Sequence, residues 1–376
     1  MSETERDQTI DIARGLSITA IVLGHVLRGL ASAQIVSPSS TSFLVTDRLL
    51  YTFHLSVFVF MSGLFVYHSV HRDGVLKYLR ERDMAFLYLY LVWSLAQGTV
   101  KLLAASLVNT PNALNDLLFI WVPEGQLWFL PFMILLTTLV ALVRPWRTRT
   151  LTVFSIAIAT VMSVAFWGLN GPFAGTQGLG LTIFYCLGVA WGAKPFMRAV
   201  SGVSSSVAIG AGVASGAVFL AIILFTNSTP PTSDGDGRSV ASVLLGVVAS
   251  LFGAAAVVLV SRFLASLGRG MTWLSFVGQR TLEIFLAHIL ATAGIRILLV
   301  QLGVDDLATH VLAGTFGGVM LPILLWWVAG KVRFPWLFTA PEAFLGRRTS
   351  TNRLSRPDTS KAVIHESEIA VDAARK

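Results

Sequence analysis

The sequence predicts an all-α integral membrane protein: a bundle of about ten transmembrane helices with both termini in the cytoplasm. Of its 376 residues, 54% are hydrophobic and only 13% are charged, whereas an ordinary soluble protein carries about 25% charged residues. The mean hydropathy is +0.71. The apolar residues also come in long blocks, without the period of an amphipathic helix or strand. These observations exclude a soluble fold, because too few charged residues remain to cover its surface.

A helix needs about 20 mostly apolar residues to cross a bilayer. The first such block keeps Arg14 and His25 and has no small-residue cleavage pattern, so we expect a retained helix rather than a signal peptide. The predicted spans are 13–34, 49–70, 84–107, 127–143, 150–169, 178–194, 206–226, 240–261, 281–301 and 308–330.

The basic residues predict the orientation of these spans. Lys and Arg gather in cytoplasmic connections, and nearly all of the 28 in this chain fall on one side of the alternating spans. The exceptions are Arg28, Arg48, Lys101, Arg238 and Arg296. The opposite connections carry acidic residues instead, among them Asp116 and Asp234. The net charge of +8 therefore indicates topology, and a nucleic-acid partner is not expected.

Two regions differ in composition. Residues 1–340 form one transmembrane domain, and residues 341–376 are polar and poor in apolar side chains, which predicts a disordered cytoplasmic tail. The single Cys186 excludes an internal disulfide or a cysteine zinc cluster. We expect neither a metal nor a bound cofactor, and the sequence does not predict an oligomeric state. The spacings Gly212–Gly216 and Gly314–Gly318 are typical of close helix contacts.

Ionisable side chains inside a membrane are costly and usually functional. Asp11, Arg14 and His25 share one face of the first span, because eleven residues return to within roughly 20° of the same direction, about 16 Å further along. This separation forbids a direct hydrogen bond between Arg14 and His25. We interpret the stripe as contacting the two ends of one elongated ligand.

Two further spans carry candidate residues, and most candidates also have a structural interpretation. His54 lies on the second span, where Asp47 and Tyr51 would anchor it in a structural role. Glu283 and His288 lie on the ninth span, about 140° apart around the helix. Glu283 would pair with Arg280 in a structural reading. For Arg14 the alternative is a snorkelling topology residue, and for His25 it is a helix–helix hydrogen bond.

Four motifs, in order along the chain, resemble the acyltransferase-3 family of bacterial membrane O-acyltransferases. They are Arg6-x-x-x-Ile10-Asp11-Ile12-Ala13-Arg14-Gly15 with Val22-Leu23-Gly24-His25; Asp47-Arg48-x-x-Tyr51-x-Phe53-His54 with Ser62-Gly63; Gln126-Leu127-Trp128-Phe129-Leu130; and Gly278-Gln279-x-Thr281-Leu282-Glu283-Ile284-Phe285-x-x-His288. The family's Arg–ten residues–His motif corresponds to Arg14 and His25. Its Arg-x-x-Arg motif has its nearest equivalent in Lys77 and Arg80, followed by Arg82. Ser56 replaces the proline that is usual after the second-span histidine.

The resemblance implies an acyltransferase of the bacterial cell membrane. It would move an acyl group, most often acetyl, from cytoplasmic acyl-CoA to a hydroxyl of an envelope glycan or glycolipid. We expect the phosphates of acyl-CoA near Arg14, Lys77, Arg80 and Arg82, and the acceptor near Trp128 and Gln126. Catalytic candidates are His25, Arg14, Asp11, His54, Glu283 and His288. His25 would act either as the base for the acceptor hydroxyl or as a covalent acyl carrier, and both remain open.

Two other classes of membrane protein share parts of this pattern. A secondary transporter also places Asp, Glu or His at mid-membrane, but usually shows internal repeats, and no convincing repeat is present here. A glycolipid flippase or exporter would share the bundle and the outer aromatic residues. It would have no need for the stripe from Arg14 to His25.

The charge distribution makes a direct prediction about topology. A reporter fused after Lys376 should be cytoplasmic, and a reporter inserted in the 227–239 connection should be external. Protease protection and reporter activity measure both positions. An external carboxyl terminus would overturn both the even number of spans and the expected position of the donor site.

Overall fold

The structure is a computed structural model that describes residues 8–106, 119–232 and 237–345. Every regular element in these residues is helical. The long helices are α1 (Gln8–Ser32), α2 (Thr41–Leu64), α4 (Val75–Leu103), α5 (Phe129–Val143), α6 (Arg149–Phe166), α9 (Ser205–Phe225), α10 (Val240–Ser266), α12 (Thr281–Gln301) and α13 (Leu307–Lys331). Shorter ones are α3 (Val66–Asp73), α7 (Thr182–Trp191), α8 (Ala193–Ser201) and α11 (Thr272–Gln279), and a 3₁₀ turn at Gly125–Trp128 precedes α5.

The all-helical prediction is confirmed for the described residues, and the number of spans is close to the expected one. Nine helical segments of the described chain are long and apolar enough to cross a membrane, and ten if α7 and α8 count as one span. Another 3₁₀ turn, Leu179–Leu181, leads into α7, and the segment Leu179–Trp191 meets α8 at a bend of 84°. The predicted span 178–194 is therefore a short helix followed by a sharp turn, because Gly192 between them takes a φ of 75° that other residues rarely adopt.

Local sequence signals set several helix boundaries. Ser40 accepts a hydrogen bond from the Phe43 amide, so α2 begins eight residues before the predicted limit of 49. Ser239 and Ser242 form a reciprocal capping box at the start of α10, and Asp306 caps α13. Gly74, with a φ of 75°, separates α3 from α4. Side-chain caps satisfy amide groups that the helix itself leaves unpaired.

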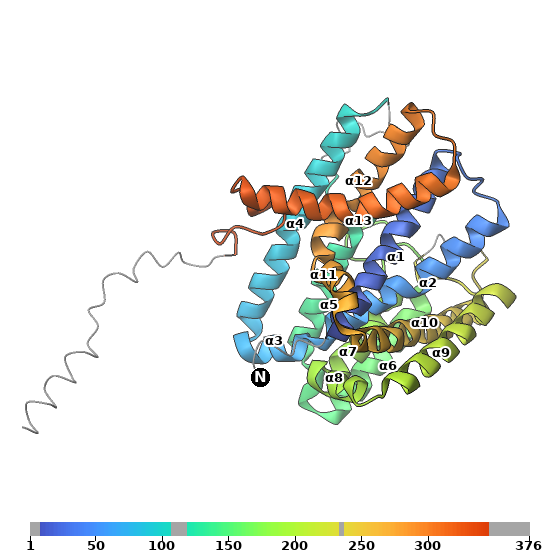
Figure 1. Ribbon diagram of the computed structural model, residues 1–376. Helices are drawn as coiled ribbons and strands as arrows, with labels where there is room; N and C mark the ends of the chain where they lie inside the picture. The colour runs from blue at the N-terminus through green and yellow to red at the C-terminus, as the bar shows by residue number, and fades with distance from the viewer. Residues whose placement is uncertain (1–7, 107–118, 233–236, 346–376) are drawn as a thin grey trace, which may run out of the picture. The chain divides into compact units, whose positions relative to one another are not determined.

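Helix α1 lies in the interior of the helical bundle (Figure 1). It packs between two groups of helices: α2 with α10, and α11 with α12 and α13. Its neighbours run in a defined sense. Arg28 near the end of α1 pairs with Asp47 near the start of α2, which makes these helices antiparallel. Arg296 near the end of α12 contacts Gly29, so α12 runs parallel to α1.

Two ends of the helical unit follow from these contacts. We call the end with the last turns of α1, α4 and α12 the histidine end, and the end with the first turns of α1 and α4 the basic end. The sequence predicts that the histidine end is external. The chain also divides into two units, Met1–Ala340 and Pro341–Lys376. The predicted disorder of the tail concerns residues that lie almost entirely outside the described ones.

Glycines allow the closest helix crossings. A Cβ on Gly278 of α11 would collide with the carbonyl oxygen of Asp11, and one on Gly15 would collide with that of Leu274. The predicted Gly212–Gly216 and Gly314–Gly318 contacts are confirmed: a Cβ at Gly212 would lie 3.1 Å from Val260, and one at Gly314 would lie 3.1 Å from Val26. Helices in lipid pack through such small residues because burial of apolar surface does not drive their association.

The α1–α11 crossing predicts a test of stability. Gly278→Ala should lower the melting temperature in detergent by several degrees, because overpacking at a rigid backbone contact costs about 1–3 kcal/mol. Gly210→Ala in α9 is the matched control, since its added Cβ meets nothing within 4 Å. Fluorescence-detected melting measures both variants. Equal melting temperatures for the two variants would contradict the close approach of these helices.

Candidate active site

Four side chains from three helices meet at the histidine end. His25 of α1 faces His288 of α12, with 5.0 Å between the ring centroids, and Tyr51 of α2, with 6.1 Å between them. Tyr51 in turn lies 4.8 Å from His54, one turn later on α2. We call His25, Tyr51, His54 and His288 the histidine cluster. His25 is half-buried, while the other three are buried.

His288 is held in one orientation behind His25. Its Nδ1 contacts the carbonyl oxygens of Ile284 and Phe285 at 3.0 and 2.9 Å. Carbonyl oxygens only accept hydrogen bonds, so Nδ1 carries the proton and donates. In the neutral ring the lone pair is then on Nε2, which is buried and has no hydrogen-bond partner among the described residues. His288 therefore presents an unused acceptor next to the His25 ring.

Arg28 lies one turn beyond His25 and is fixed by two contacts with α2. Its Nε and Nη2 donate to the two carboxylate oxygens of Asp47 at 2.6 and 2.9 Å. The guanidinium also lies over the Tyr51 ring, 3.3 Å from its centroid. A bidentate ion pair and a stacked ring together restrict a long flexible side chain. The site thus has a positioned cation beside the histidine cluster.

A cavity of about 190 Å³ opens onto these residues, and we call it the polar cavity. Its lining comes from α1, α2, the turn before α5, α12 and two loops. The lining residues that matter here are His25, Arg28, Tyr51, His54, Gln126 and Trp128. His288 is not part of the lining and lies behind His25. At about 30 Å³ for each water molecule, this volume holds about six waters, or one small reacting group.

Gln126 and Trp128, the two residues expected near the acceptor, line the wall of the polar cavity. The Gln126 amide nitrogen lies 3.4 Å from the carbonyl oxygens of Phe285 and Leu286 on α12. Its amide oxygen is buried without a hydrogen-bond partner among the described residues. Nearby, Lys101 of α4 and Glu124 form an ion pair that ties the turn of Gly125 to the helices.

Other candidates lie away from the cluster. Glu283 pairs with Arg280 at 3.4 Å, the structural arrangement anticipated from the sequence, and Arg280 stacks over Trp326 at 3.7 Å. Asp11 accepts a hydrogen bond of 2.9 Å from Gln279. Arg14 lies over the ring of Phe65, 5.2 Å from its centroid. None of Asp11, Arg14 and Glu283 lines the polar cavity.

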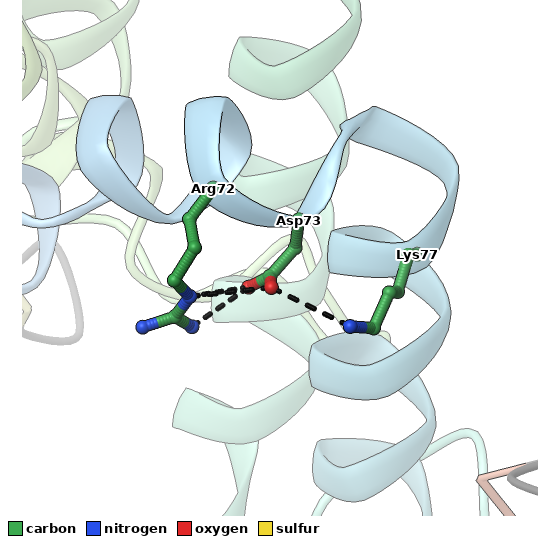
Figure 2. Close-up of polar contacts among 3 residues, drawn as sticks. All are labelled: Arg72, Asp73 and Lys77. Atoms are coloured by element: carbon green, nitrogen blue, oxygen red, sulfur yellow. Dashed lines mark hydrogen bonds and ion pairs between the residues drawn. The ribbon is translucent and has the colours of Figure 1, made fainter. Parts of the chain in front are cut away.

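The basic motif lies at the basic end, at the junction of α3 and α4. Lys77 and Arg72 approach the Asp73 carboxylate from two sides, at 3.6 and 2.7 Å (Figure 2). Arg80 is exposed, and the guanidinium of Arg82 lies 4.8 Å from the centroid of Phe86. Lys77, Arg80 and Arg82 thus lie in the first turns of α4, whereas the turn that lines the polar cavity is tied to Lys101 near the end of that helix.

The face of α1 between Arg14 and His25 is apolar and packed. Ile18 is 0% exposed and Ile21 is 3% exposed, and both belong to the main hydrophobic core. Ile21 lines the polar cavity, which ends there. The predicted stripe is thus two polar ends joined by a packed segment.

The sequence interpretation missed two kinds of site residue. The sequence predicts Arg28 only as a basic residue on the outer side, although its position three residues after His25 places it on a neighbouring face of the same helix. Gln177 and Thr232 line the polar cavity from loops. No periodic pattern marks loop residues, so nothing in the sequence indicated these two.

Comparison with known proteins identifies a family whose profile covers these site residues. The profile of an acyltransferase domain matches residues 7–327, which include the whole histidine cluster. The chain belongs to the acyltransferase-3 family. A relative in the family, the nodulation protein NolL of Mesorhizobium japonicum, is 26% identical over 188 residues, or 49% of this chain. The match covers 47% of that relative's own length, so the chain spans about half of the curated relative it matches. No solved structure matches the chain.

The Arg28–Asp47 pair predicts a position that is sensitive to substitution. Asp47→Asn removes the charge that holds Arg28, and hydrogen bonds to charged groups are worth about 1.5–3 kcal/mol. Acyl transfer should fall by about tenfold or more, in protein that still folds and whose melting temperature falls by no more than the several degrees expected for Gly278→Ala. Asp305→Asn is the control, because Asp305 is an exposed carboxylate at the same end. Wild-type rates for Asp47→Asn would show that Arg28 needs no anchoring.

Proposed function

We propose that this acyltransferase moves an acetyl group from cytoplasmic acetyl-CoA to a hydroxyl of a cell-envelope glycan or glycolipid, in a bacterial cell membrane. The observation that carries the proposal is His25 on the wall of a small polar cavity, backed by His288 and flanked by Arg28 and Tyr51. Two catalytic candidates of the described chain, His25 and His54, line the cavity, and of these His25 is the half-buried one, with the rings of both His288 and Tyr51 beside it. The family assignment supplies the reaction class.

The reaction in this proposal uses His25 as the base. The acceptor hydroxyl oxygen attacks the thioester carbon, and its proton passes to a ring nitrogen of His25. The C–S bond then breaks, and His25 returns the proton to the leaving thiolate. The net products are the acetyl ester and free coenzyme A. A base within hydrogen-bond reach of the hydroxyl is the geometric requirement of this step.

Two neighbouring groups, His288 and Arg28, would assist His25 in this step. The His288 Nε2 lone pair would accept the N–H of His25 and so fix the tautomer, as a second partner usually does for a catalytic histidine. Arg28 is the cation on the cavity wall, and it would stabilise the negative charge that develops on the thioester oxygen. The alternative route, acetylation of His25 followed by transfer, uses the same neighbours.

The size of the polar cavity favours a short acyl group. A volume of about 190 Å³ lies below the roughly 300–1,000 Å³ of sites that enclose whole small molecules. The acetyl group and one acceptor hydroxyl fit, but the nucleotide of the coenzyme does not. In the proposal the coenzyme's phosphates remain at the basic end, near Arg14, Lys77, Arg80 and Arg82, and the Ile18–Ile21 segment must move to admit the pantetheine arm.

The chemical step predicts the effect of removing His25. His25→Ala should lower turnover by about 10²–10⁴, the usual contribution of a general base, while acetyl-CoA still binds. Turnover and acetyl-CoA binding are measured on the same nanodisc samples. His68→Ala, an exposed histidine at the basic end, is the control and should behave as the parent. Normal turnover in His25→Ala would reject the mechanism.

Arg14 provides the complementary variant in that experiment. Arg14→Gln should weaken acetyl-CoA binding first, and Arg14→Lys should recover little if the contact is bidentate. A transporter or lipid exporter would behave differently: acetyl-CoA would not bind, and no variant would change a rate of acyl transfer. That result would overturn the proposed function as a whole.

A further inference from the structure

A second, larger cavity meets the polar cavity at His25. Its volume is about 500 Å³, and it shares His25, Arg28 and Gly125 with the polar cavity. The rest of its lining comes from α1, α4, α12 and α13 and is mostly apolar, with Val26, Leu30, Val100, Leu290 and Ile297 as the principal side chains. Val100 and Gly294 on its wall are exposed, so the cavity is open at the surface of the protein. We call it the apolar groove.

Gly294 keeps the groove open on the α12 side. A Cβ built on Gly294 meets nothing within 4 Å, although the residue lies in the middle of a helix, where glycine costs up to about 1 kcal/mol relative to alanine. The groove glycines of α1 and α13 behave differently. A Cβ on Gly29 would lie 3.2 Å from the Arg296 guanidinium, and one on Gly314 would lie 3.1 Å from Val26. Gly294 alone of these three has empty space in front of it.

The groove also contains a cation with no acidic partner. Arg296 of α12 donates to the Gly29 carbonyl oxygen at 2.7 Å, and no Asp or Glu of the described chain forms an ion pair with it. The other two cations of the groove are both neutralised, Arg28 by Asp47 and Lys101 by Glu124. An uncompensated charge within a membrane span is costly and is usually a functional residue.

We propose that the apolar groove binds the lipid anchor of the acceptor, a hydrocarbon chain with a phosphate headgroup, and that Arg296 pairs with the phosphate. This inference rests on the proposed function and names the substrate class of its acceptor. Apolar walls match the chain, and the single unneutralised guanidinium matches the anion. The meeting of the groove with the polar cavity at His25 brings a hydroxyl attached to the headgroup to the base.

The position of the groove decides between acceptor and donor. The groove lies at the histidine end, among the last turns of α1, α4 and α12 and the first turns of α13. The donor's charged nucleotide is expected at the basic end, beyond the packed segment of Ile18. A substrate that enters at the histidine end therefore comes from the acceptor side. The volume, within the usual 300–1,000 Å³ range of ligand sites, fits part of a chain as well as a headgroup.

Photo-crosslinking of purified protein in phosphatidylcholine nanodiscs tests the proposal. The probes are a diazirine-bearing polyprenyl phosphate, the uncharged polyprenol with the same diazirine, and diazirine-bearing palmitoyl-CoA. Mass spectrometry locates the labelled residues. The phosphate probe should label 26–32 and 289–297, and Gly294→Leu should reduce this labelling about tenfold by filling the groove. Gly330→Leu is the matched control, an exposed helical glycine whose added Cβ also meets nothing within 4 Å.

Arg296→Gln distinguishes recognition of the phosphate charge from hydrophobic binding of the hydrocarbon chain in the groove. It should reduce labelling by the polyprenyl phosphate about tenfold and leave labelling by the uncharged polyprenol unchanged. Equal loss for both probes, no effect of Gly294→Leu, or stronger labelling of the groove by palmitoyl-CoA would each overturn the proposal. Acetyl-CoA turnover is measured on the same wild-type samples. Absence of acyl transfer there would reject the proposed function, whereas the labelling results test the groove separately.

Discussion

The burial of α1 is the constraint on which the rest of the structure depends. Lipid offers no hydrogen bonds to polar groups, so a helix that carries Asp11, Arg14, His25 and Arg28 must turn all of them toward protein. Other helices therefore surround α1, and the glycines of α11 and α13 let them approach closely enough to do so. Three of these four residues meet a polar partner on a different neighbour: Gln279 for Asp11, Asp47 for Arg28 and the carbonyl-anchored His288 for His25. The fourth, Arg14, lies over the Phe65 ring.

Much of this arrangement is visible in the sequence, for a physical reason. Long apolar blocks, their punctuation by glycine and proline, and the small-residue spacings are local features, and the structure confirms the helices and the glycine contacts. The pairing of Glu283 with Arg280 is also local, since the two lie one turn apart. The order of the motifs likewise predicted the family that the chain belongs to.

Other features depend on how distant segments meet, and no local pattern contains that information. The stripe from Arg14 to His25 is correct as helix geometry, but the packing of Ile18 and Ile21 against other helices is not visible from spacing. The bidentate pair between Arg28 and Asp47 joins two helices whose register is set by the loop between them. Gln177 and Thr232 reach the polar cavity from loops, where residue order gives no direction in space. The bend at Gly192 similarly turned one expected span into two helices.

The packed segment around Ile18 has a further consequence, which concerns the membrane rather than the reaction. A protein that joined a cytoplasmic donor to an external acceptor through an open channel would short-circuit the ion gradients of the cell. Two isoleucines buried in the core close the face of α1 between Arg14 and His25, so this face offers protons and ions no polar path along the helix. The segment around Ile18 must therefore block ions and yet let the acetyl group pass, and these two requirements oppose each other. Any opening there must be narrow and brief, and must close tightly around whatever passes.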